Sequence, residues 1–329
     1  MDDKLLITPA PHISSVKTVR GIMLDVVISL LPATLAGIII FGIRSLQLVL
    51  ASVIAAVAAE AIYQKVAKKP VTVNDMSAVV TGLLLALTLP PDAPIWIPII
   101  GSAFAIIVAK QIFGGLGTNF VNPALAGRAF IVAAWPLHMT QDWLNPMTHD
   151  AITGATPLAV FNNTGTTSLG VKDLLLGLRA GSLGETCIIA LLAGGIYLIA
   201  RDVIDWRIPV GYLGTLALGT WIFGSPNGFF QGDWLSGILL GGAVLGSIFM
   251  ATDYVTSPVT PTGRFYMGVG AGIITLLIRV WGGYPEGVTY AILFMNLVTP
   301  LIDKYVVPKY YGYMHDIQAR KAAAGGGTK

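Results

Sequence analysis

Residues 22–41 read Ile22-Met-Leu-Asp-Val-Val-Ile-Ser-Leu-Leu-Pro-Ala-Thr-Leu-Ala-Gly-Ile-Ile-Ile-Phe41. The stretch carries one charged side chain, Asp25, and has about the 20 residues that a helix needs to cross the hydrocarbon core of a bilayer. Its proline and its glycine would weaken a helix in water. Membrane helices tolerate both, because neighbouring helices satisfy the freed backbone groups. The stretch therefore predicts a membrane-spanning first helix.

The rest of the chain has a similar composition. Of its 329 residues, 54% are hydrophobic and 11% are charged, whereas a typical soluble domain is about 25% charged. The mean hydropathy is +0.74. This composition excludes a disordered chain, a basic nucleic-acid binder and a cytosolic enzyme with a charged surface. It indicates that the solvent of most of the chain is lipid.

Ten apolar runs are candidates for membrane helices. They span residues 22–41, 46–66, 78–89, 95–112, 124–135, 186–200, 208–223, 235–251, 265–281 and 287–302. The third and fifth runs are only 12 residues long, so they are interpreted as tilted, broken or core helices. We predict an all-α polytopic membrane protein with about ten spans, with nine and eleven left open.

The basic residues indicate the orientation of these spans. With ten spans and the N-terminus inside, 15 basic residues lie inside, 4 lie outside, and Arg128 lies within a span. Such an excess of inside lysine and arginine is typical of membrane proteins. Six of the seven tryptophans also fall at span ends, where indole rings prefer the interface. Both termini are therefore predicted to be cytoplasmic.

The spans divide the chain into five predicted parts. Residues 1–20 form a cytoplasmic segment, 21–135 a first group of five helices, 136–185 an external loop, 186–302 a second group of five, and 303–329 a cytoplasmic tail. The loop is the one sizeable polar region between spans and is rich in Asn, Thr and Gly. It is interpreted as a folded flap on the outer membrane surface.

The two groups of helices carry a related signature. Lys110-Gln-Ile-Phe-Gly-Gly115 closes the fourth span of the first group, and Arg279-Val-Trp-Gly-Gly283 closes the fourth span of the second. Five is an odd number of spans, so the second group would enter the membrane upside down. This predicts two inverted repeats, an arrangement that in transporters surrounds a central site with broken helices. Ordinary C-capping by glycine is the alternative.

Within the external loop, residues 150–158 read Asp150-Ala-Ile-Thr-Gly-Ala-Thr-Pro-Leu158. The small side chains at Gly154 and Ala155 leave room for another molecule to approach. Pro157 favours an extended backbone at Thr156, which projects the hydroxyl of Thr156 outward. From the residues alone, the segment reads as a threonine-rich turn.

This segment resembles the flavinylation motif Asp-x-x-Ser/Thr-Gly-Ala-Ser/Thr of the RnfD and NqrB family of membrane proteins. In that family, a flavin transferase joins FMN to the last hydroxyl residue through a phosphoester. The resemblance implies that Thr156 is the FMN acceptor. It also implies that Asp150, Thr153, Gly154 and Ala155 form the recognition part, with Thr153 standing where serine is commoner.

The resemblance covers most of the chain. Residues 8–12 (Thr-Pro-Ala-Pro-His), residues 122–130 and residues 253–258 (Asp-Tyr-Val-Thr-Ser-Pro) also look like this family. It implies a component of an Rnf complex in a bacterial or archaeal cell membrane, with RnfA, RnfB, RnfC, RnfE and RnfG as partners. Such a complex is a translocase that passes electrons between ferredoxin and NAD and couples this flow to Na⁺ or H⁺ movement.

The chain carries no complete active site of such an enzyme. It has no GxGxxG motif that opens a helix after a strand and no phosphate-binding GxxxxGK[ST] motif, so the ferredoxin and NAD sites are expected in other subunits. One cysteine, Cys187, and four scattered histidines predict no metal site in the chain. Catalytic residues are left unassigned.

A second flavin is a further hypothesis. Related NqrB proteins hold a non-covalent riboflavin towards the inner side, and the predicted inner loop 252–264 is dense in hydroxyl residues and prolines. This loop could cap such a flavin, with Tyr254 or Phe265 stacking on the ring. A rigid connector between two helices is the alternative.

Asp25, Glu60 and Arg128 are the clearest ionisable residues within predicted spans, where burying a charge is costly. Asp25 is expected to reach the inner interface, and Glu60 is expected to be interfacial near Lys65. Arg128 is expected to pair with a carboxylate or to approach the flavin phosphate, because a guanidinium suits phosphate; an anchor between subunits is the alternative.

Two other classes of function compete with the flavoprotein. They are a small-solute transporter or channel that uses the repeat without redox chemistry, and a structural membrane scaffold. Neither of them needs the motif at Thr156, so the motif favours the flavoprotein.

Overall fold

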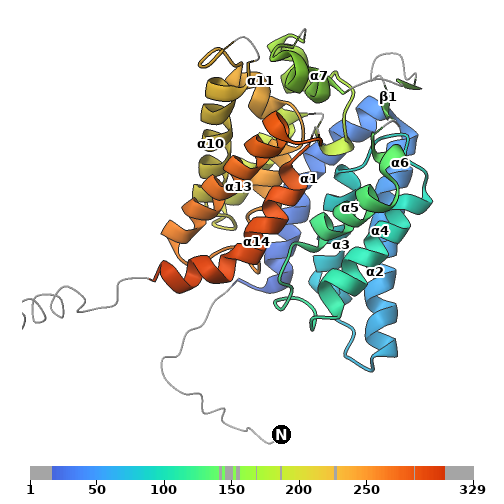
Figure 1. The fold of residues 1–329 in the computed structure, drawn as a ribbon. Coiled ribbons are helices and arrows are strands. Elements are labelled where there is room, and N and C mark those ends of the chain that lie inside the picture. Colours follow the sequence, from blue (N-terminus) through green and yellow to red (C-terminus); the bar gives the residue numbers. More distant parts are fainter. Residues whose placement is uncertain are drawn as a thin grey trace, which may run out of the picture.

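The computed structural model describes residues 17–140, 143–144, 151–152, 156–167, 169–185, 187–225, 228–284 and 286–307. Within these residues the chain is helical, apart from one two-residue antiparallel ladder between β1 (Trp143–Leu144) and β2 (Ala151–Ile152). The prediction of an all-helical membrane protein is confirmed at this level. Figure 1 shows two groups of helices side by side, with α7 and β1 at the same end of the molecule as α11.

Each of the first five apolar runs is helical. The elements of this group are α1 (Val19–Phe41), α2 (Ile43–Val66), η1 (Val73–Asp75), α3 (Ser77–Leu87), α4 (Trp96–Ile106), its π-helical continuation η2 (Ile107–Gln111), and α5 (Pro123–Ala134). Helix α2 packs against both α3 and α4, and α4 packs against α5. Asn122 begins α5 as its N-cap, because its side-chain oxygen accepts hydrogen bonds from the backbone N–H groups of Ala124 and Leu125.

The segment between the two groups contains short helices. They are α6 (Pro136–Thr140), α7 (Pro157–Thr164), α8 (Val171–Leu176) and η3 (Leu183–Glu185). Helices α7 and α8 both end at a glycine in the left-handed region, Gly165 and Gly177, which is a common way to stop a helix. This segment therefore has folded elements at both of its ends.

The second group of helices follows η3 in the chain. Its elements are α9 (Ile188–Ala200), α10 (Arg207–Phe223), α11 (Trp234–Leu239), α12 (Ala243–Leu245), the π-helical η4 (Gly246–Met250), α13 (Pro261–Trp281) and α14 (Val288–Tyr305). Helix α10 packs against α11 and α13, and α13 packs against α14. If α11, α12 and η4 are counted as one broken third helix, the second and fourth helices contact each other in both groups, as α2 with α4 and as α10 with α13.

Three of these helices have the length and composition to cross a membrane, namely α1, α2 and α13. Large apolar side chains on the first two face outward, among them Ile39 and Ile54. Outward apolar faces on long helices fit a lipid surrounding. The chain is therefore described as a multi-pass membrane protein.

The two groups meet through their first and fifth helices. Helix α1 packs on α9, and α5 packs on α14. The approach of α1 to α9 depends on Gly194, because a Cβ atom at that position would overlap the backbone carbonyl oxygen of Ser29. Small residues that let helix backbones approach closely are typical of membrane helix packing.

The eighth apolar run is broken, although the sequence predicts a continuous helix over 235–251. Helix α11 stops at Leu239, Gly241 has a φ of +74°, and the chain restarts as α12. Glycine adopts this left-handed conformation without the steric cost that a side chain would bring. The break places backbone carbonyl and N–H groups of this segment inside the bundle.

The expectation that Glu60 lies at the membrane interface is wrong. Its side chain is 1% exposed and forms an ion pair with Lys110 on η2, at 2.9 Å between Nζ and Oε1. Lys110 also donates to Ser77 Oγ at 2.6 Å, and Gln111 donates to Glu60 Oε1 at 2.7 Å. The sequence interpretation counts Lys110 among the inside basic residues, at the end of the fourth span, whereas in the structure Lys110 neutralises a carboxylate within the first group.

Candidate functional site

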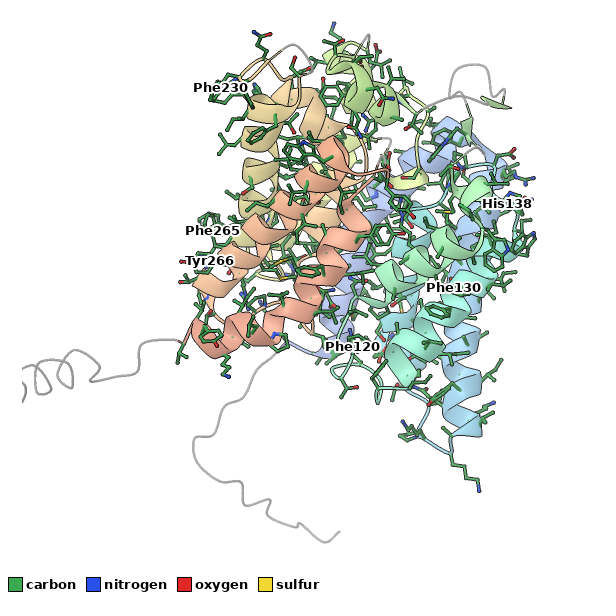
Figure 2. All side chains as sticks on the ribbon, in the orientation of Figure 1. Phe120, Phe130, His138, Phe230, Phe265 and Tyr266 are labelled. Atoms are coloured by element: carbon green, nitrogen blue, oxygen red, sulfur yellow. The ribbon has the colours of Figure 1, made fainter. Side chains whose placement is uncertain are left out.

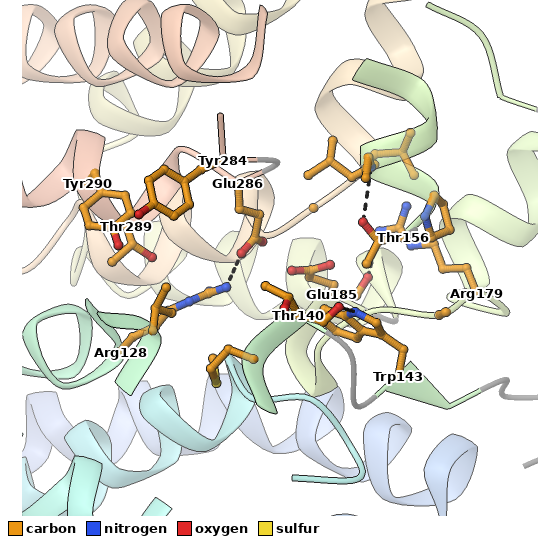
Figure 3. A pocket seen from close by; sticks show the side chains of 18 residues that line it. Arg128, Thr140, Trp143, Thr156, Arg179, Glu185, Tyr284, Glu286, Thr289 and Tyr290 are labelled. Carbon is orange, nitrogen blue, oxygen red and sulfur yellow. Dashed lines mark hydrogen bonds and ion pairs between the residues drawn. The ribbon is translucent and has the colours of Figure 1, made fainter. Parts of the chain in front are cut away.

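An open cavity of about 150 Å³ lies where the segment between the two groups meets both of them (Figure 3). Its charged lining residues are Arg128, Arg179, Glu185 and Glu286. Its aromatic lining residues are Trp143, Tyr284 and Tyr290, and Thr156 also lines it. Figure 3 shows Arg128 and Glu286 pointing at each other on one side and Thr156 and Arg179 on the other. We call this space the outer cavity.

Thr156 has the backbone conformation that its proline neighbour predicts. Its φ and ψ are −61° and 155°, and it is the N-cap of α7, where its Oγ1 accepts a hydrogen bond from Ala159 N at 3.2 Å. Pro157 occupies the first helical position, which suits its fixed φ. The hydroxyl therefore sits at a helix N-terminus, which favours a negatively charged group.

The other motif residues lie outside the described part of the chain. These are Asp150, Thr153, Gly154 and Ala155. The structure therefore assigns a position only to the acceptor Thr156.

Arg128 forms an ion pair with Glu286, through its Nη2 and the Oε2 of the carboxylate. The expectation that Arg128 pairs with a carboxylate is confirmed. Arg128 lies on α5 in the first group, and Glu286 lies just before α14 in the second, so the pair ties the two groups together. Glu286 Oε1 also accepts a hydrogen bond from Gly242 N at 3.0 Å, next to the start of α12.

Two buried arginines hold the break between α11 and α12. Arg179 Nη2 donates to Leu239 O at 2.6 Å, and Arg279 donates to Gly237 O at 2.6 Å and to Leu240 O at 3.1 Å. These carbonyls belong to the last turn of α11, where partial negative charge collects and cations are favourable. The Nη1 atom of Arg179 is buried and has no hydrogen-bond partner among the described residues.

Glu185 and Glu286 form a pair of carboxyl groups beside these arginines. Burial, and then the charge of Glu286 and its hydrogen bond to Glu185, raise the pKa of Glu185 to about 8. Burial also acts on Glu286, but the charge of Arg128 and the hydrogen bonds from Glu185 and Gly242 outweigh it and lower the pKa of Glu286 to about 2. At neutral pH the pair therefore holds one proton.

The outer cavity fits a ligand that is both aromatic and phosphorylated. The spare donor atom of Arg179 and the N-terminus of α7 suit a phosphoryl group near Thr156. The rings of Trp143, Tyr284 and Tyr290 offer apolar and aromatic surface. The sequence reasoning missed Arg179, Glu185 and Glu286 as site residues, although ionisable groups beside apolar spans were a usable signal.

A second cavity of about 80 Å³ lies near the start of α5, and we call it the inner cavity. It is lined by Lys110, Asn119, Asn122, Asp253 and Tyr254, together with apolar residues of α1, α3 and α9. Burial raises the pKa of Asp253.

The two residues suggested for a second flavin are not brought together in the inner cavity. Tyr254 lines it, whereas Phe265 lies against Gly211 of α10. Figure 2 shows Phe265 and Tyr266 at the outer edge of the bundle, near the start of α13. Tyr254 therefore lines the inner cavity, and Phe265 does not.

The fold and the outer cavity define a class: a multi-pass helical membrane protein with an ionised, aromatic cavity between two groups of helices. The chain matches the sequence profile of the NQR2, RnfD, RnfE family over residues 6–312, and it belongs to that family.

Named relatives cover nearly the whole chain. The D subunit of the Na(+)-translocating ferredoxin:NAD(+) oxidoreductase complex of Acetobacterium woodii is 48% identical over 94% of this chain and 95% of its own length. The D subunit of the proton-translocating ferredoxin:NAD(+) oxidoreductase complex of Clostridium ljungdahlii is 46% identical over 93% and 96%. The D subunit of the ion-translocating oxidoreductase complex of Halorhodospira halophila is 35% identical over 92% and 94%.

Proposed function

We propose that this chain is the D subunit of an ion-translocating ferredoxin:NAD oxidoreductase complex, an Rnf complex, and that it carries FMN joined to Thr156 through a phosphoester. The observation that carries the proposal is the position of Thr156: the acceptor residue of the motif lines a cavity that also contains Arg128, Arg179 and three aromatic rings. The likeness to relatives named as D subunits of such complexes supports the assignment to the complex.

The residues of the outer cavity have distinct roles in this function. FMN, when bound, supplies the capacity to accept and donate electrons. Thr156 holds the phosphoryl group at the N-terminus of α7, and the free Nη1 of Arg179 offers it a donor. The covalent bond keeps the cofactor at a high effective concentration on a face from which it would otherwise be lost.

The proposed topology is ten spans in two inverted five-helix repeats. It is supported by the matching packing of the second and fourth helices in each group, and by the pairing of like helices across the groups, α1 with α9 and α5 with α14. Both termini are then cytoplasmic, and the segment 136–185 with Thr156 is external. Residues 150–155 serve in this proposal as the site that a flavin transferase recognises.

A non-covalent riboflavin is proposed for the inner cavity. The cavity has hydrogen-bond donors and acceptors in Asn119 and Asn122, a buried cation in Lys110 and an aromatic ring in Tyr254. It adjoins the first turn of α5, whereas the outer cavity adjoins Arg128 and Val132 further along the same helix. Two flavins would thus lie along one helix between the two groups.

The partners in this proposal are the other subunits of the complex, RnfA, RnfB, RnfC, RnfE and RnfG, and the lipid bilayer. Ferredoxin and NAD bind to those subunits, and the electron flow through this chain is coupled to Na⁺ or H⁺ translocation by the assembled complex. This chain supplies an electron carrier and no complete active site.

The test is in-gel flavin fluorescence after denaturation, using protein from cells that contain the flavin transferase. We expect a fluorescent band for wild type and for Thr156→Ser, which keeps a hydroxyl, and a dark band for Thr156→Ala. Thr164→Ala, at the other end of α7, is the matched control and stays fluorescent. A dark wild-type band, or a fluorescent Thr156→Ala band, contradicts the proposal.

A further inference from the structure

Four ionisable side chains line the outer cavity, namely Arg128, Arg179, Glu185 and Glu286. A fifth, Arg279, lies beside Gly241 close to Glu286. Arg128 binds Glu286. Glu185 and Glu286 converge on one backbone position, because a Cβ atom placed on Gly242 would stand 3.6 Å from Glu185 Oε1 and 3.3 Å from Glu286 Oε1. Two carboxyl groups that share a site disfavour ionisation of both, because like charges repel. The geometry therefore favours one proton in the pair, independently of any cofactor.

Charged and titratable groups surround this pair on several elements. They are Arg128 on α5, Arg179 between α8 and η3, Tyr212 on α10, Arg279 on α13, Tyr284 before α14 and Tyr290 on α14. The three arginines and the two carboxyl groups give a local charge of +2 when one proton is shared and +1 when it is lost. The shared proton thus keeps this part of the cavity positive.

We infer that Glu185 and Glu286 form a proton-sharing pair that couples proton binding to the redox state of the cofactor in the outer cavity. The inference rests on the proposed function for its redox part. Its proton-binding part concerns this chain alone.

The coupled step moves one electron and one proton. A one-electron reductant adds an electron to the cofactor, which puts one negative charge into the cavity. That charge stabilises the protonated pair, so at a pH where Glu185 is ionised its carboxylate oxygen binds a proton from the aqueous phase and becomes a carboxylic acid. The Glu286 side chain is 22% exposed, which gives the pair a route to water.

The pH range of the coupling follows from the sign of this effect. In the chain alone the pKa of Glu185 is about 8, and the negative charge that reduction adds to the cavity raises it. Below pH 8 the proton is bound in both redox states, so the pair adds no pH dependence to the midpoint potential. Above pH 8 reduction takes up a proton, so the potential falls as the pH rises.

The experiment is a potentiometric titration of the covalent flavin in the purified protein, with dithionite as reductant, between pH 6 and pH 10. Glu185→Gln keeps the shape of the side chain and a donor for Glu286, and removes the titration. We expect the difference between the wild-type and Glu185→Gln potentials to be constant below about pH 8. Above that pH we expect it to change by up to ~59 mV per pH unit for a one-electron step, because a tenfold change in an equilibrium corresponds to that value.

The matched control is Asp173→Asn, which removes a carboxylate from α8 in the same segment between the two groups. Its potentials follow those of wild type at every pH. Parallel curves for wild type and Glu185→Gln across the whole pH range overturn the inference, provided that both proteins carry the flavin at equal stoichiometry.

A second measurement tests proton binding without the cofactor. Infrared spectra of the Thr156→Ala protein are expected to show the band of a protonated carboxyl group below about pH 8, and Thr156→Ala/Glu185→Gln is expected to lack it. Absence of this band from the Thr156→Ala protein at pH 6 overturns the inference. If wild-type protein carries no covalent flavin, the proposed function fails, and the infrared result still decides the proton-sharing pair.

Discussion

The buried ion pair of Glu60 and Lys110 gives the sharpest stability prediction. Lys110 Nζ has three short polar contacts, at 2.9 Å and 3.1 Å to the two carboxylate oxygens and at 2.6 Å to Ser77 Oγ. Glu60→Met removes two of the three and leaves a buried ammonium group with one neutral partner. Breaking a buried pair from one side costs about 3–5 kcal/mol, so we expect a loss of stability of that size.

The reverse substitution distinguishes the charge from the packing. Lys110→Met leaves Glu60 with Gln111 as its nearest donor, at 2.7 Å, and we expect a loss of about 3 kcal/mol, at the lower end of that range. The double variant Glu60→Met/Lys110→Met leaves no unpaired charge. We expect its stability to lie within about 1 kcal/mol of wild type, because apolar replacement of a whole buried pair is often neutral.

The assay is thermal unfolding of the purified protein in detergent, followed by tryptophan fluorescence or circular dichroism. Asp92→Asn is the control, because the Arg44–Asp92 pair is 45% and 41% exposed and should contribute less than about 1 kcal/mol. If the two single losses simply add in the double variant, the pair is not coupled and the reasoning is refuted.

Three further substitutions test the packing and the charges of the second group. Gly194→Ala should lower the stability by about 1–3 kcal/mol, because the new Cβ atom would overpack against Ser29. Gly214→Ala is the control and should raise the stability by about 0.5–1 kcal/mol, because nothing lies within 4 Å of a Cβ atom there. Equal effects at the two sites in thermal unfolding would count against the close approach of α1 and α9. Burial opposes ionisation of Asp205, but its hydrogen bonds, including that from Arg264, outweigh burial and lower its pKa. The contribution of the ionised Asp205 to the stability is therefore present above about pH 4 and is lost as the pH falls through the folded-state pKa. Asp205→Asn should therefore destabilise the protein by about 1 kcal/mol at pH 7, and this difference should shrink as the pH falls below about 4. A difference that does not shrink below that pH would contradict this assignment.

The apolar pattern predicted the helices well, because a membrane helix must satisfy its own backbone hydrogen bonds. All ten runs coincide with helical segments. The pattern could not predict the break at Gly241, because apolar residues continue on both sides of it. The break depends on Arg179 and Arg279, which bind the freed carbonyl groups from other parts of the chain.

The partners of buried charges were harder to predict than the charges themselves. Arg128 was expected to pair with a carboxylate, but nothing near it in sequence identified Glu286, 158 residues away. Glu60 was assigned to the interface because Lys65 is close in sequence, whereas its partner is Lys110. Tertiary packing brings such groups together, and one sequence carries little local signal for it.

The resemblance of its motif to a known family implies that Thr156 is the acceptor, and its proline neighbour predicts an extended backbone there. The structure adds what surrounds this residue. The motif indicates a covalent bond but not the charges that receive the cofactor. Arg179 lines the same cavity, with its spare donor atom, because the chain folds back after α8. The cavity thus gives a physical reason why this threonine, at the start of α7, is a suitable place for a phosphoester.

The central claim is a covalent FMN at Thr156, and intact-protein mass spectrometry tests it most directly. The protein is purified from cells with the flavin transferase, and the wild-type mass is compared with that of Thr156→Ala. The account predicts that wild type exceeds its sequence mass by one FMN less one water, with the added mass on the peptide that contains Thr156. It predicts no such addition in Thr156→Ala. An unmodified wild-type chain, or the same added mass in Thr156→Ala, would contradict the account.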